Sequence, residues 1–138
     1  MKLACSAIVV MLVAGCAGDL ENPQRFTDCP PGQVEQLFQA KCAGADGMGC
    51  HSANMPDAEL DLVSPNVGAR VKSLTSTNMC EGRALVEADP TANHLMVEKL
   101  EEDPTCGSRM PFGEQELTAK EIECVRRWVD ELATEASP

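Results

Sequence analysis

The sequence places a thiol directly beside an imidazole, at Cys50-His51. A thiol can form a thioether or ligate a soft metal, and an imidazole nitrogen can ligate iron or zinc. The nearest upstream thiol, Cys42, is separated from Cys50 by seven residues, three of which are glycine. Far downstream a thioether stands at Met110, where the following Pro111 restricts the backbone. Together these residues indicate a site that holds a metal or a metal-containing cofactor.

A thiol followed by an imidazole is also the second half of the C-x-x-C-H sequence that attaches c-type haem. Cys50 would then bind a haem vinyl group, and His51 would be the proximal iron ligand. Met110 has the softness expected of a distal ligand that stabilises ferrous iron. This sequence differs from C-x-x-C-H in its spacing, because seven residues instead of two separate Cys42 from Cys50. Because the glycines of this insert accept positive φ angles, the insert can loop out and return Cys50.

Other interpretations of the same residues remain open. Cys42 and Cys50 can form a local disulfide that leaves no haem attached, or they can bind zinc with His51 and a further thiol. His94 can replace Met110 as the distal ligand, or it can be a half-exposed packing residue. Three further thioethers are expected to fill gaps or lie exposed: Met48, Met55 and Met79.

The elements that must position these residues are helical. Apolar residues at helical spacing predict a first helix over residues 33–41, a short one over 67–74 and a last one over 119–134. Thr118 and Glu121 form a capping-box pattern before the last helix. Asp89-Pro90 predicts the start of another helix that reaches residue 101. No segment alternates as a strand does, so we expect an all-α fold of three to five helices with long loops.

Over residues 37–132, about 70% of the chain, the order of these features resembles a small bacterial cytochrome c domain. The resemblance implies one haem c bound by Cys42 and Cys50, with His51 as proximal and Met110 as distal ligand. It also implies that Trp128 packs where the first and last helices cross. The motifs that carry it are Phe38-x-x-Lys41-Cys42, Cys50-His51, Leu60-Asp61-Leu62, Asp89-Pro90, Lys99-Leu100, Met110-Pro111, Leu117-Thr118 with Glu121-Ile122, and Trp128.

The function implied by the resemblance is single-electron transfer. A His/Met-ligated iron has no open position for substrate, and the sequence holds no Ser-His-Asp set, phosphate loop or paired-carboxylate motif, so we expect no enzyme activity. The alternative is a haem-free, disulfide-rich lipoprotein that acts as a binding or structural module. One Trp, no Tyr and three Phe leave little to fill a core, which a haem or disulfides would offset.

The first residues read as an export signal. Lys2 precedes an apolar run over residues 3–14, and Val13-Ala14-Gly15-Cys16 resembles a bacterial lipobox. We therefore expect a signal peptide over 1–15, a lipid anchor on Cys16, a flexible tether over 16–28 and the cytochrome c-like domain over 29–138. The protein would sit on the periplasmic side of a bacterial membrane or on the cell surface. An ordinary signal peptide with a coincidental cysteine is the alternative.

The net charge of −11 predicts an acidic surface that repels nucleic acid. Such a surface would suit redox partner proteins with a basic docking face, or it is solvated without a particular partner.

Of the eight cysteines, Cys5 would be lost with the signal peptide, Cys16 would carry the lipid, and Cys42 and Cys50 would bind the haem. The other four can pair in three ways. Cys80 with Cys106 would close a segment near Met110, and Cys29 with Cys124 would tie the start of the domain to its last helix. Cys124 can instead be a buried free thiol.

Overall fold

The computed structural model describes residues 29–138 except 45–48, 78, 81, 114–115 and 136–138. The described part contains α1 (Gln33–Lys41), the 3-10 turn η2 (Asp57–Glu59), α2 (Val67–Ser73), α3 (Leu95–Glu98) and α4 (Ala119–Thr134). Its only β pairing is an isolated bridge between Thr75 and Ala84. The all-α expectation is therefore confirmed for these residues. The predicted signal segment 1–15, the lipid-attachment residue Cys16, the tether over 16–28 and Met48 lie outside them.

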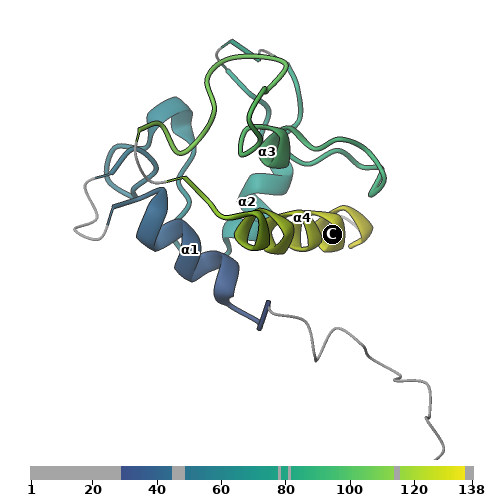
Figure 1. The fold of residues 1–138 in the computed structure, drawn as a ribbon, viewed down its shortest axis with the longest axis horizontal. Helices are drawn as coiled ribbons and strands as arrows, with labels where there is room; N and C mark the ends of the chain where they lie inside the picture. The colour runs from purple at the N-terminus through teal and green to yellow at the C-terminus, as the bar shows by residue number, and fades with distance from the viewer. Residues whose placement is uncertain (1–28, 45–48, 78, 81, 114–115, 136–138) are drawn as a thin grey trace, which may run out of the picture.

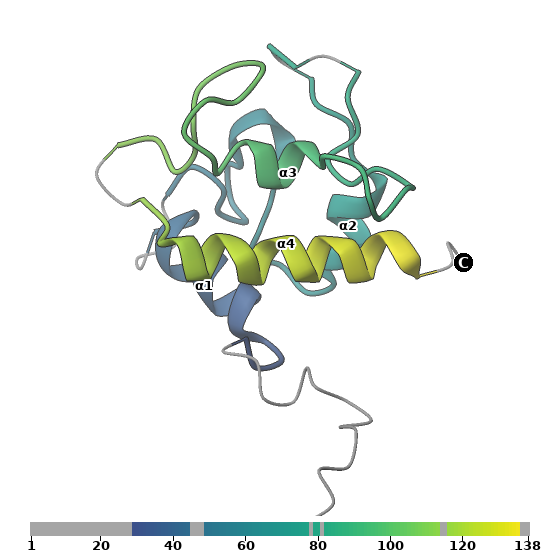
Figure 2. The same ribbon diagram turned by 45° about the vertical axis from the view of Figure 1, so that its right-hand side comes forward.

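Helix α4 is the element on which the other three helices pack (Figures 1 and 2). It begins with the predicted capping box: the Thr118 hydroxyl accepts from the Glu121 amide, and the Thr118 amide donates to the Glu121 carboxylate at 2.7 Å. Its buried face is formed by Cys124, Val125, Val129 and Leu132. Within the described ranges, no helix has the length and apolar character needed to cross a bilayer.

Helix α1 meets α4 through an aromatic contact. The rings of Phe38 and Trp128 lie edge to face, with centroids 5.5 Å apart and an interplanar angle of 78°. Such pairs stabilise a core by about 0.5–1.5 kcal/mol beyond the area they bury. The Lys41 ammonium lies 2.9 Å from the Glu121 carboxylate at the same crossing. The prediction that Trp128 packs between the first and last helices is confirmed.

The helix predicted from Asp89-Pro90 to residue 101 is wrong at both ends, because only Leu95–Glu98 is helical. The Asp89 carboxylate instead accepts hydrogen bonds from the amide and the hydroxyl of Thr91, at 2.8 and 2.7 Å, which makes a local turn. An Asp side chain that binds the backbone two residues on favours a turn over a helix. The helix begins only after His94, whose backbone is extended.

Two disulfides close the described chain. Cys29–Cys124 joins the segment that precedes α1 to α4, and Cys80–Cys106 joins two loops on either side of α3. Both candidate pairings are therefore confirmed, and the alternative of a free Cys124 is wrong. Cys42 and Cys50 are free thiols, so the local disulfide between them is absent.

Candidate cofactor site

A cavity of about 660 Å³ opens between the end of α1, the loops that follow it, α3 and the loop that carries Met110. Its volume falls within the range of about 300–1,000 Å³ usual for small-molecule and cofactor pockets. Most of the side chains that line it are apolar, such as Phe38, Leu62, Leu95 and Leu100. An apolar ligand would therefore be buried against mostly apolar side chains here.

His51 lines this cavity from the loop after α1. Its Nδ1 atom lies 3.0 Å from the carbonyl oxygen of Leu60. A carbonyl oxygen only accepts, so Nδ1 carries the hydrogen and the lone pair of the neutral ring is on Nε2. The backbone carbonyl of His51 also accepts from the Leu62 amide at 3.1 Å, which fixes the main chain beside the ring. This is the arrangement that orients a histidine for metal ligation through Nε2.

Met110 lines the same cavity from a different part of the chain. Its side chain packs against the apolar core, and its amide donates to the carbonyl of Lys99 at 2.6 Å. The thioether and the imidazole therefore meet one cavity although they are far apart in the sequence. Those two residue types form the axial ligand pair of low-spin c-type haem.

The two free thiols among the described residues differ in their environments. Cys42 lines the cavity, and burial raises the pKa of its thiol to about 11, against the smaller opposing effect of the Lys41 charge. Cys50 is exposed and does not line the cavity. The structure thus brings three of the four predicted haem-binding residues to one cavity and leaves the Cys50 side chain outside it.

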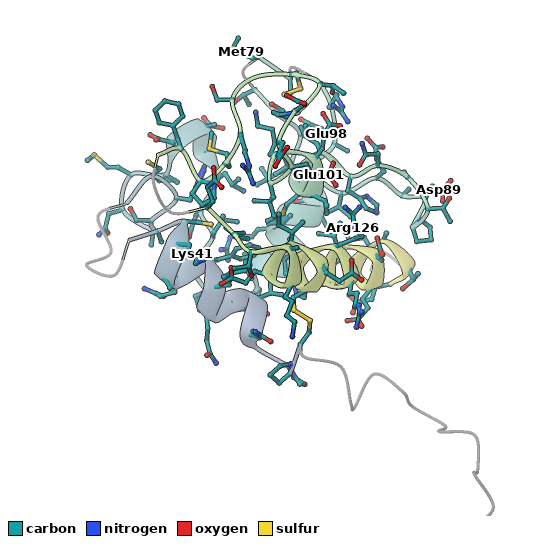
Figure 3. The ribbon with its side chains drawn as sticks, in the orientation of Figure 1. Lys41, Met79, Asp89, Glu98, Glu101 and Arg126 are labelled. Carbon is teal, nitrogen blue, oxygen red and sulfur yellow. A yellow bond between two sulfur atoms is a disulfide. The ribbon has the colours of Figure 1, made fainter. Side chains whose placement is uncertain are left out.

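The other histidine and methionine candidates differ in where they lie relative to the cavity. His94 is buried, and its Nδ1 accepts from the Glu87 amide at 3.0 Å. It does not line the cavity, so it packs in the interior and is not half-exposed as the sequence suggested. Met55 is exposed outside the cavity, whereas Met79 is exposed on a loop at the cavity rim (Figure 3).

Sequence reasoning missed the role of Lys99 in the cavity wall. Lys99 and Glu59 are the charged residues among the described lining, and the Lys99 ammonium donates to the carbonyl of Cys106 at 2.9 Å. Burial lowers the pKa of Lys99. In the sequence, Lys99-Leu100 indicated only the end of a helix and gave no sign that Lys99 lines a cavity. A cation at one side of an apolar cavity can pair with the carboxylate of an amphipathic ligand.

The zinc interpretation finds no support in the described ranges. Within them, no group of three or more His, Cys, Asp or Glu side chains is placed to hold a metal ion. The haem interpretation does not need such a group, since its protein ligands are one imidazole and one thioether.

Buried Glu98 holds together the loops around the cavity. Its carboxylate accepts from the Arg83 guanidinium at 3.1 and 2.9 Å and from the Thr105 amide at 2.7 Å. The hydrogen bonds from Arg83 are the main reason that the pKa of Glu98 falls to about 2, with those from Thr105 adding to the effect against desolvation. Arg83 and Thr105 flank the Cys80–Cys106 disulfide, so the ion pair and the disulfide fix the same loops.

Comparison of this chain with models of protein families, with curated proteins and with solved structures gave no match.

Proposed function

We propose that this protein transfers single electrons through one c-type haem held in the cavity. The observation that carries the proposal is the pairing of His51 and Met110 on one apolar cavity, with His51 Nδ1 bonded to the Leu60 carbonyl. That bond leaves Nε2 available as an iron ligand. A haem bound there would accept and release one electron at its iron.

The residues of the chain have separate roles in this proposal. His51 and Met110 would both hold the iron, which would leave it no open position for substrate and argues against an enzyme. The thiols of Cys42 and Cys50 would each add across a vinyl double bond. In each addition one S–C bond forms and the thiol hydrogen passes to the neighbouring carbon, so no oxidant is required. Lys99 would pair with a haem carboxylate at the cavity wall.

The Met ligand and the apolar cavity would both raise the reduction potential. A neutral thioether stabilises ferrous iron, and low polarity disfavours the extra positive charge of the ferric state.

We further propose that Cys16 carries a lipid that holds the domain outside a bacterial membrane. The acidic surface would then meet redox partners through their basic faces.

The test is the full chain expressed with a c-type haem maturation system. Covalent haem gives sharp reduced visible bands and remains with the protein after acid-acetone extraction. The mass of the mature chain also shows whether Cys16 is lipidated.

Met110→Ala should lower the reduction potential and open the sixth position to external ligands. Met55→Ala is the matched control, because Met55 is 84% exposed and outside the cavity, and it should leave the potential unchanged.

A haem-free binding or structural module is the second candidate. It is favoured by the exposure of the Cys50 thiol and by two disulfides that hold the loops without any cofactor. A colourless, folded protein from a strain that matures other c-type haem proteins would support this candidate and overturn electron transfer.

A further inference from the structure

Two backbone hydrogen bonds close the insert between Cys42 and Cys50 at its base. The Gly49 amide donates to the carbonyl of Ala43 at 2.7 Å, and the His51 amide donates to the carbonyl of Cys42 at 3.1 Å. The main chain on the two sides of the insert is therefore in direct contact.

The upstream side of this contact is fixed by α1. The amides of Cys42 and Ala43 both donate to the Phe38 carbonyl at 2.9 Å, and Ala43 is fully buried. The downstream side is fixed as well: the Cys50 carbonyl accepts from the Asp57 amide at 2.6 Å. The Cys50 backbone is thus held while its side chain is exposed.

Gly49 makes the close approach possible. A Cβ added at Gly49 would lie 2.4 Å from the carbonyl carbon of Ala43 and 2.6 Å from the amide nitrogen of Gly44. Real Cβ atoms do not come that close to backbone, so any larger residue at 49 would push the two sides of the insert apart.

We propose that the site is a C-x-x-C-H sequence interrupted by an insert over residues 44–48. In space, Gly49 follows Ala43. The five residues Cys42, Ala43, Gly49, Cys50 and His51 therefore have the order Cys-Ala-Gly-Cys-His. Gly49 is the positioning residue that joins the two halves, and residues 44–48 are not needed for haem attachment. The inference rests on the proposed function, since it concerns how the same haem is attached.

The experiment excises residues 44–48 so that Ala43 is bonded directly to Gly49. We expect the excised chain to carry one haem on the same two thiols, as shown by intact mass and peptide mapping, with reduced bands like those of the wild type. Without haem, it should fold with an unchanged or higher melting temperature, because a shorter loop costs less entropy to close.

Gly49→Ala tests the junction itself. In the full chain it should cause loss of attached haem, because the added methyl group meets Ala43 and Gly44. In the excised chain the same substitution should be tolerated, because Gly44 is gone and Ala43 has become the covalent neighbour. A general structural role for Gly49 would instead predict the same loss in both chains, so equal effects would contradict the proposal.

The outcomes separate this inference from the proposed function. A wild-type chain without haem overturns the proposed function, and this inference falls with it. If the wild-type chain carries haem and the excised chain folds without it, only the inference is wrong. An excised chain that does not fold in the haem-free form also overturns the inference, because it shows that the two sides cannot be joined.

Discussion

The imidazole of His51 is fixed by the backbone of Leu60, whose carbonyl oxygen lies 3.0 Å from Nδ1. The other histidine of the chain, His94, has the opposite arrangement, because its Nδ1 accepts from the Glu87 amide. The two rings therefore hold different neutral tautomers. His51, whose ring lone pair is on Nε2, lines the cavity. His94 keeps its hydrogen on Nε2, 3.4 Å from the Asp130 carboxylate.

The first prediction concerns these tautomers. In the haem-free protein with neutral rings, long-range ¹H–¹⁵N spectra should show His51 protonated on Nδ1 and His94 on Nε2. Each ring serves as the internal control for the other, and His94→Gln assigns the signals. Finding His51 protonated on Nε2 would mean that the Leu60 hydrogen bond is absent and that the ring is not oriented for ligation.

The second prediction concerns Cys42 and Cys50 before haem is attached. Because burial raises the pKa of Cys42 to about 11, less of it is thiolate at pH 8 than of an exposed cysteine. An increase of 2 pKa units corresponds to about a hundredfold less thiolate. Iodoacetamide should therefore modify exposed Cys50 before Cys42, as read by peptide mapping. The Cys42 rate should rise about tenfold per pH unit between pH 7 and 9.

The control for this labelling is Cys50→Ser, which removes the exposed thiol and leaves the Cys42 rate to be followed alone. Equal rates at the two thiols of the wild-type chain at pH 8 would show that Cys42 is not buried against the cavity.

The third prediction concerns the stability of the fold in acid. The folded-state pKa of Glu98, about 2, lies below its usual value of 4.5. The stabilisation by ionised Glu98 is therefore complete above about pH 4.5 and is lost as the pH falls towards 2. Glu98→Gln should lower the free energy of unfolding at pH 7 by up to about 3 kcal/mol, since it removes the charge that pairs with Arg83.

Chemical denaturation between pH 2 and 7 measures this effect. The difference between the wild type and Glu98→Gln should shrink as the pH falls below 4.5. Glu102→Gln is the matched control, because Glu102 is exposed and close in sequence, and it should change stability by less than about 0.5 kcal/mol. A difference between the wild type and Glu98→Gln that does not change with pH would contradict an ionised Glu98.

The fourth prediction concerns the disulfide near the Met110 loop. Cys80 and Cys106 are 26 residues apart, and closing such a loop stabilises the fold by about 3.5 kcal/mol in the chain-entropy model. The double substitution Cys80→Ser with Cys106→Ser should lower the free energy of unfolding by about that amount. Cys50→Ser, which breaks no disulfide, should cost less than about 0.5 kcal/mol. Equal stability of the double variant and the wild type would show that the bond adds nothing to the fold.

The sequence alone determined the elements whose signals are local. The bounds of α1 and α4 match the apolar spacing, and the Thr118–Glu121 capping box forms as its pattern predicts. These contacts join residues within one or two helical turns, so their geometry follows from the helix itself. The Asp89-Pro90 signal failed for the same kind of reason. Asp89 can serve a helix start or a turn, and the nearby Thr91 favoured the turn.

Only the tertiary structure decided how the candidate site is put together. It placed His51 and Met110 on one cavity, brought Lys99 into the wall and left Cys50 exposed. The contact between Ala43 and Gly49 likewise depends on α1 holding one side and the Asp57 amide holding the other. The resemblance grouped His51 with Met110, but local sequence patterns do not fix such contacts, because they join segments whose relative positions are set by packing across the whole domain.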